Sequence, residues 1–256
     1  MQQYSTIDII CIALVVAAVV LGACALFSGP VWRWFLLAAG LFSALAAMAV
    51  GINAEWLAAL DVSVEKWFEA HRSRRGLIDA RGIFRFVGSP MHVAGAAVVC
   101  GTLLSLRARS AIPVFLVVGG VGFGVVVERV FKAMVGRTST AVAELQGRSN
   151  LLHFEHAFPS GHVTGSAALL GMIAVCLGMG RSRAVRIALT VPAVAGVLLV
   201  AFVAVYAKPH TFTDVIGGML LGGAIVSLGA AVLGATNYSP RASAAAPANG
   251  PSPPLA

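Results

Sequence analysis

About seven stretches of this chain are apolar over enough residues to cross the hydrocarbon core of a membrane as helices. They are residues 8–28, 33–53, 91–107, 112–133, 163–180, 186–207 and 212–235. Hydrophobic residues make up 59% of the chain, charged residues only 11%, and the mean hydropathy is +0.90, which excludes an ordinary soluble domain. The sequence therefore predicts an all-α fold, a polytopic bundle of membrane helices.

The basic residues fall mainly between these apolar stretches. The formal net charge is +8, but the Lys and Arg residues are not gathered on a soluble face, so we expect no nucleic-acid partner. The short basic clusters at 107–109 and 181–186 are typical of cytoplasmic loops. Counting spans from them puts residues 159–162 on the extracytoplasmic side of what we expect to be a bacterial plasma membrane.

Residues 54–90 differ in character from the spans. They mix Trp67, Phe84 and other apolar residues with charges such as Lys66 and Arg81. This pattern predicts one or two amphipathic helices on the membrane surface, which could form a lid or a lipid-entry rim. A solvated charged loop with a few buried anchors is the alternative. The tail, 237–256, is rich in Ala, Pro, Ser and Gly and is predicted to be disordered.

The motif Phe158-Pro159-Ser160-Gly161-His162 puts a titratable ring where a membrane helix should begin. Proline is tolerated in the first turn of a helix, serine is a good N-cap, and glycine lets a ligand approach the backbone. The free N–H groups and the positive dipole end of such a helix suit an anion such as phosphate. The alternative is a capped helix start with an interfacial histidine.

His210 and Asp214 are separated by one helical turn at the start of the last span. If that helix begins near Pro209, the carboxylate can orient the imidazole and stabilise its cationic form. A simple capping interaction is the other interpretation of this spacing.

Charged residues also end the span 112–133. Glu128 and Lys132 are four residues apart, so they can pair along one helix face, or they can snorkel to the interface. Because Lys132, His162 and His210 all fall at span ends on one side of the membrane, the sequence predicts a common site there.

The sequence gives little support for a metal or cofactor. His153, Glu155 and His156 lie close together in the loop 138–158, but their spacing fits no established ligand pattern. The four cysteines fall within predicted spans and show no metal or redox spacing. We therefore expect no metal and no cofactor.

The order of these motifs resembles that of the type 2 phosphatidic acid phosphatase superfamily, which also includes vanadium haloperoxidases and bacterial acid phosphatases. The family pattern is K-x6-R-P, then P-S-G-H, then S-R-x5-H-x3-D. Here it is matched by Lys132, Pro159-Ser160-Gly161-His162, and His210 with Asp214. The chain departs from the pattern at two places, where Arg-Pro is replaced by Ser139-Thr140 and Ser-Arg by Val203-Ala204. In the family, both missing arginines bind phosphate oxygens.

The resemblance covers about residues 54–235. It implies a six-helix phosphatase core at 33–236, which includes the surface segment 54–90 and follows an extra N-terminal span in residues 1–32. It also implies that the substrate is a membrane lipid phosphate or lipid diphosphate. The oligomeric state is left open.

The resemblance further implies a mechanism without metal. His210 would attack phosphorus to form a phosphohistidine, supported by Asp214, while His162 protonates the leaving oxygen; water then hydrolyses the intermediate. The groups expected to hold the phosphoryl oxygens are Lys132 and the N–H groups of Ser160 and Gly161. Arg137, helped by Arg148 or Lys208, is expected to replace the missing arginine contacts.

Two alternatives to hydrolysis stay open. Lipid head-group transferases related to the family keep the two histidines and the aspartate but lack the arginines, so the phosphoryl group could pass to a lipid or sugar acceptor. The other alternative is a catalytically inactive membrane protein that binds a lipid phosphate or scaffolds partners. A vanadium peroxidase is disfavoured, because vanadate binding in the family also uses the missing arginines.

Overall fold

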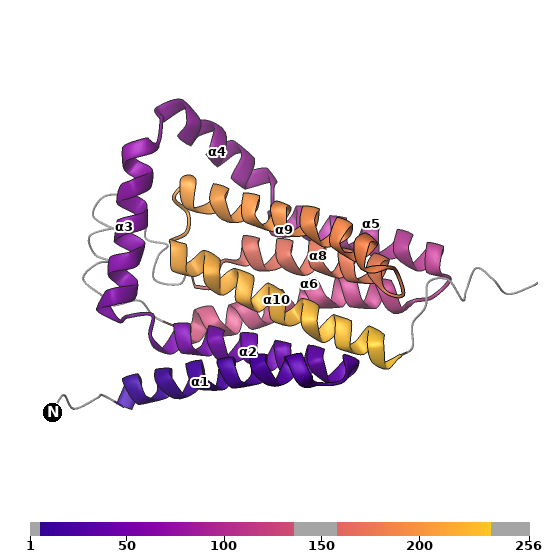
Figure 1. Cartoon of the computed structure of the whole chain (residues 1–256). Coiled ribbons are helices and arrows are strands. Elements are labelled where there is room, and N and C mark those ends of the chain that lie inside the picture. The colour runs from indigo at the N-terminus through magenta and orange to yellow at the C-terminus, as the bar shows by residue number, and fades with distance from the viewer. Residues whose placement is uncertain (1–5, 136–157, 237–256) are drawn as a thin grey trace, which may run out of the picture.

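The computed structural model of the chain describes residues 6–135 and 158–236 (Figure 1). Over these residues the chain is helical, without strands. Seven of the described helices are long and apolar enough to cross a membrane: α1 (Thr6–Phe27), α2 (Pro30–Val50), α5 (Pro90–Ala108), α6 (Ile112–Met134), α8 (Gly161–Gly178), α9 (Arg183–Tyr206) and α10 (Phe212–Ala235). The predicted all-α membrane bundle is therefore confirmed, and each predicted span corresponds to one helix.

Helices α8 and α10 form the centre of the bundle. In their most apolar windows 56% and 61% of the residues are buried, against at most 22% in the other spans. Small residues allow this packing: a Cβ atom at Gly222 of α10 would collide with Ala167 of α8. The two helices that carry the histidine motifs are thus the two that the bundle encloses.

The outer helices turn apolar side chains outward, where lipid would contact them. Helix α1 is the extreme case, with only 6% of its window buried, and it packs on α2, which in turn packs on α10. The division of the chain at residues 32 and 236 stays a prediction.

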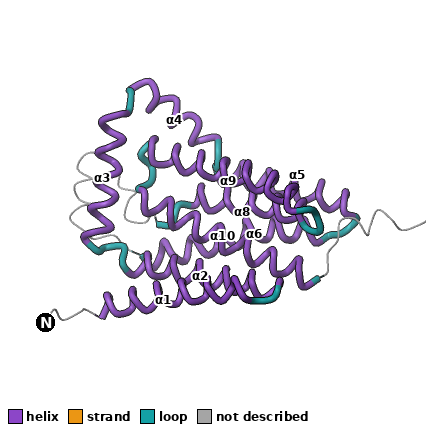
Figure 2. Tube along the Cα trace, in the orientation of Figure 1, coloured by secondary structure: helices purple, strands orange, loops and turns teal. Residues whose placement is uncertain are grey.

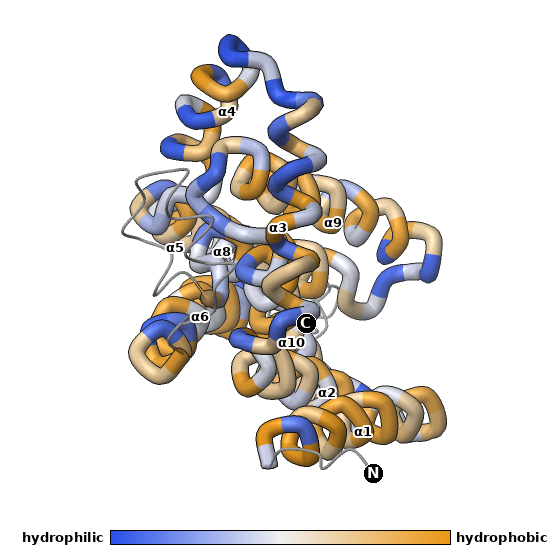
Figure 3. Tube along the Cα trace, turned by 90° about the vertical axis from the view of Figure 1, so that its left-hand side faces the viewer, coloured by the Kyte–Doolittle hydropathy of each residue, from blue (hydrophilic) through white to orange (hydrophobic). Residues whose placement is uncertain are grey.

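The segment between α2 and α5 forms two further helices, α3 (Glu55–His71) and α4 (Arg74–Phe86). Helix α3 runs across one end of the bundle, and Figure 3 looks onto that end, where both helices show mixed polar and apolar residues. The Ser73 hydroxyl caps α4 by accepting a hydrogen bond from the Gly76 N–H at 3.0 Å. The predicted amphipathic helices are therefore present, and the loops that the structure describes lie at the ends of the bundle (Figure 2).

Several predicted features lie outside the described residues. These are Arg137, Arg148, the Ser139-Thr140 departure, the group His153, Glu155 and His156, and the tail 237–256.

Candidate active site

Helix α8 begins directly after Ser160, which is its N-cap residue. The Ser160 side chain makes no capping hydrogen bond, and its Oγ is buried without a hydrogen-bond partner among the described residues. Pro159 precedes the cap instead of lying in the first turn, so the expected capping arrangement is wrong in this detail. The Ser160 N–H donates to the backbone oxygen of Asp214 at 2.9 Å. This bond joins the start of α8 to the start of α10 and occupies the amide that we expected to hold phosphate.

The start of α10 is set by Thr211 and Asp214, which form a capping box. The Thr211 N–H donates to Asp214 Oδ2 at 2.9 Å, and the Asp214 N–H donates to Thr211 Oγ1 at 3.4 Å. The helix therefore begins at Phe212, where the predicted span 212–235 begins, and a start near Pro209, on which the orienting role of Asp214 was made conditional, is not observed. His210 lies just before the cap.

Asp214 is fully buried, and its Oδ2 lies 3.7 Å from His210 Nδ1. This distance is longer than a hydrogen bond, and Nδ1 has no hydrogen-bond partner among the described residues. Asp214 thus caps its helix and its carboxylate also lies near the imidazole, but the orientation of the His210 ring by Asp214 stays a prediction.

The two histidine rings lie side by side. His162 stands in the first turn of α8, and its ring centroid is 6.2 Å from that of His210, with an angle of 60° between the ring planes. A single phosphoryl group could therefore contact both rings.

An aromatic side chain from the surface segment covers these rings. Phe84 of α4 stacks on His162 with a centroid distance of 4.2 Å and presents an edge to His210 at 6.1 Å. Sequence reasoning did not assign it to the site, and the sequence does not separate it from Phe86, which is 67% exposed and packs against His92. Helix α4 therefore contributes directly to the site.

Lys132 forms an ion pair with Glu128, one turn earlier on α6, which is one of the two arrangements that their spacing allowed. The Glu128 carboxylate fills the space that a Cβ atom at Gly161 would occupy. It therefore lies at the N-terminus of α8, where the helix dipole favours an anion. Any larger residue at position 161 would require the Glu128 side chain to move.

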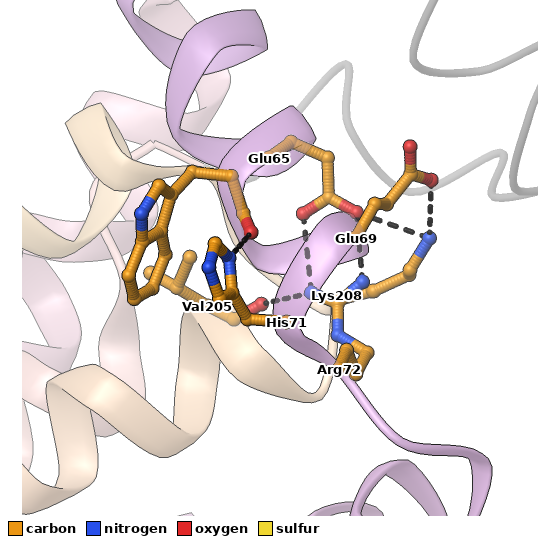
Figure 4. A network of polar contacts seen from close by, with 7 residues as sticks. Glu65, Glu69, His71, Arg72, Val205 and Lys208 are labelled. Carbon is orange, nitrogen blue, oxygen red and sulfur yellow. Dashed lines mark hydrogen bonds and ion pairs between the residues drawn. The ribbon is translucent and has the colours of Figure 1, made fainter.

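Lys208 is directed to helix α3. Its Nζ lies 3.0 Å from Glu65 Oε1 and 3.0 Å from Glu69 Oε1 (Figure 4). The expectation that Lys208 takes over arginine contacts to phosphate is therefore not supported by its contacts.

The position of the second missing arginine is apolar. Ala204 is fully buried in a hydrophobic cluster, and Phe84 packs against the same cluster. The other buried members are Val163, Val200, Ala201, Val205 and Val215. Alanine here is part of the packed apolar core.

An apolar cavity of about 270 Å³ extends from this site between α5, α6 and α8. Glu128 and Gly161 lie among its lining residues, and the rest of the lining is apolar, glycine or proline, as at Ala97 and Val121. Among the residues that the structure describes, no group of three or more His, Cys, Asp or Glu side chains could hold a metal ion.

Residues 113–237, which run from α6 to just past the end of α10, match the family model of the PAP2 superfamily. The structure is similar to that of a transmembrane PAP2-type phosphatidylglycerolphosphate phosphatase from Bacillus subtilis, with a TM-score of 0.64 and 19% identity over 79% of this chain and 97% of that chain. No curated protein matches the chain by sequence. The family match includes both histidine motifs and Lys132, whereas α3 and α4 lie outside it.

Proposed function

Because residues 113–237 of this integral membrane protein match the PAP2 superfamily, we propose that it is an enzyme that hydrolyses a lipid phosphate or a lipid diphosphate. One observation carries the proposal: His162 and His210 meet at the joined starts of α8 and α10, with their ring centroids 6.2 Å apart and Asp214 buried behind His210. The two rings provide a nucleophile and a general acid in neighbouring positions.

In the first step, His210 attacks phosphorus. Asp214 lies on the Nδ1 side of the ring, so Nε2 is the nitrogen that forms the new N–P bond. The P–O bond to the lipid breaks at the same time, and His162 gives its proton to the leaving oxygen. The buried carboxylate of Asp214 stabilises the positive charge that the His210 ring acquires.

In the second step, water attacks the phosphohistidine. His162, now neutral, takes a proton from this water, the N–P bond breaks, and inorganic phosphate leaves. Phe84 covers both rings and restricts the access of other water molecules.

The phosphoryl oxygens would be held by Lys132, the Gly161 N–H and the Ser160 hydroxyl, which is buried and has no hydrogen-bond partner among the described residues. The Ser160 amide has a smaller part than we expected, because it bonds to Asp214. Arg137 and Arg148 remain our candidates for the missing guanidinium contacts.

A lipid substrate is supported by the apolar cavity that reaches Glu128 and Gly161. Its volume of about 270 Å³ would accommodate part of a hydrocarbon chain while the phosphate lies at the start of α8. We further propose that this end of the bundle faces the extracytoplasmic side of a bacterial plasma membrane, and the short basic loops support this orientation.

Transfer to an acceptor is the second candidate function. It is favoured by the apolar packing of Ala204, which leaves the site with less positive charge than two arginines would give. An acceptor-dependent reaction would use the same phosphohistidine, but a lipid or sugar hydroxyl would replace water.

The test is phosphate release by purified protein from phosphatidic acid, phosphatidylglycerol phosphate and a polyprenyl diphosphate. His210→Ala should abolish release, whereas the control His71→Ala, at an exposed histidine of α3, should not. Release that requires an added acceptor hydroxyl would indicate the transferase. Binding of the lipids without turnover in either condition would contradict both enzymatic proposals.

A further inference from the structure

Surface helix α3 contacts the segment that carries His210 on both sides of that residue. On the C-terminal side the contact is made by Asp61, which is only 4% exposed. Its Oδ1 accepts a hydrogen bond from the Thr213 N–H at 2.8 Å, and its Oδ2 accepts one from the Thr213 hydroxyl at 2.7 Å. Thr213 is in the first turn of α10, where backbone N–H groups have no partner within the helix and a negative charge is favourable.

A buried carboxylate is costly unless its oxygens are hydrogen-bonded. Asp61 meets this requirement through Thr213, so the contact is specific in position and direction. It fastens the middle of α3 to the beginning of the helix that follows His210.

On the N-terminal side of His210, the contact is an ionic network (Figure 4). Lys208 pairs with Glu65 and Glu69 of α3, both at 3.0 Å. Arg72, at the C-terminal end of α3, binds Glu65 through both terminal nitrogens and donates to the backbone oxygen of Val205 at 3.3 Å. This network holds the end of α9 and the turn that leads to His210.

The backbone at Lys208 adds to this restraint. Its φ angle is +72°, in the left-handed region that non-glycine residues seldom adopt. The ion pairs of its side chain stabilise a turn that the local sequence alone would disfavour.

Few contacts with described residues hold the His210 ring itself in position. Its Nδ1 makes no hydrogen bond to any described residue, with Asp214 Oδ2 3.7 Å away, and the ring lies beside those of Phe84 and His162. The position of the ring therefore depends on the backbone between Lys208 and Thr213, and α3 holds both of these residues.

We infer that α3 is a clamp that positions His210 for attack, with Asp61 as its main positioning residue and Lys208 as a structural tie, not a phosphate ligand. The inference rests on the proposed role of His210 as the nucleophile. A displacement of about 1 Å at a reacting group can lower the rate on the order of a hundredfold, so loosening the clamp should reduce kcat while substrate binding is retained.

The first experiment compares Asp61→Ala with Asp61→Asn in the full-length protein in detergent. The alanine variant loses both hydrogen bonds, and we expect a fall in kcat of about 30- to 100-fold with KM changed less than about twofold. The asparagine variant keeps an acceptor for the Thr213 N–H and should retain activity within about fivefold of the wild type. The control Glu55→Ala, at an exposed residue on the first turn of α3, should be unchanged.

A second measurement needs no substrate. Hydrogen exchange of the peptide that spans residues 205–215 should become faster in Asp61→Ala and stay at the wild-type rate in Glu55→Ala. Lys208→Met should also raise this exchange and lower kcat without raising KM. If Lys208 instead bound the phosphate of the substrate, its replacement would raise KM.

These readouts separate the two proposals. Exchange that is unchanged in Asp61→Ala overturns the clamp, whatever the activity. Faster exchange with unchanged kcat overturns its role in positioning His210. If the wild type has no turnover, the proposed function fails, and the clamp is then tested by the rate at which His210 is carbethoxylated. This rate should differ from that of the wild type in Asp61→Ala but not in Glu55→Ala. Equal rates in all three proteins would overturn the clamp.

Discussion

The carboxylate of Glu128 lies against Gly161 at the N-terminus of α8, where the proposed phosphate would bind. The same carboxylate pairs with Lys132, the cation that the family motif uses for phosphate. In this structure, one anionic side chain thus contacts two of the proposed phosphate ligands, and an entering phosphate has to displace it.

Replacing Glu128 by Gln should therefore strengthen the binding of phosphate. Removal of the competing charge should lower the inhibition constant of inorganic phosphate by about three- to tenfold, equivalent to roughly 1 kcal/mol. The inhibition constant is measured from the inhibition of lipid turnover by inorganic phosphate, and the control Glu55→Gln should leave it unchanged. Weaker inhibition in Glu128→Gln would mean that the carboxylate holds Lys132 in place for the substrate.

Gly161→Ala should lower activity only moderately, because the new Cβ meets the far end of the flexible Glu128 side chain, which would have to shift at the start of α8. The double variant Gly161→Ala with Glu128→Ala should regain part of it, since the collision is removed. Gly95→Ala is the control, because a Cβ atom at Gly95 of α5 has no other atom within 4 Å. Equal loss in the single and double variants would contradict this explanation.

Phe84→Ala should uncover the two histidine rings and reduce kcat by about tenfold or more, since water enters and the His162 ring loses its stacking partner. The rate at which diethyl pyrocarbonate modifies His162 should rise in the same variant. Phe86→Ala, at an exposed phenylalanine of the same helix, should leave both quantities unchanged. An unchanged modification rate in Phe84→Ala would contradict the proposed cover.

Restoring the family arginine by Ala204→Arg should destabilise the protein instead of activating it. Ala204 is fully buried among apolar side chains, so the substitution combines overpacking with an unpaired charge, at a cost of about 3 kcal/mol or more. Thermal unfolding in detergent would show a lower midpoint than for Ala184→Arg, at an exposed residue near the start of α9. A stable and more active Ala204→Arg would show that the site accommodates the guanidinium.

The membrane helices could be predicted well because their lengths and composition are dictated by the bilayer. Each predicted span overlaps one helix, with ends that differ by a few residues. The start of α10 coincides with that of the predicted span 212–235, and the sequence carries its signal: Thr211 followed three residues later by Asp214 is a capping box with aspartate in place of the usual glutamate.

The contacts between distant segments could not be predicted in the same way. The bond from the Ser160 N–H to the Asp214 oxygen, the stacking of Phe84 on His162 and the burial of Asp61 against Thr213 all depend on how helices pack. Asp61 is one of several acidic residues in an amphipathic segment, and no local pattern distinguishes it from the exposed Glu55.

The phosphohistidine can be tested most directly by trapping it. The purified protein is mixed with lipid substrate that carries a radioactive phosphate and is quenched within a turnover. We predict a labelled protein whose label is lost in acid and kept in alkali, present in the wild type and absent in His210→Ala. Labelling that persists in His210→Ala, or phosphate release by the wild type without any labelled protein, would contradict the account.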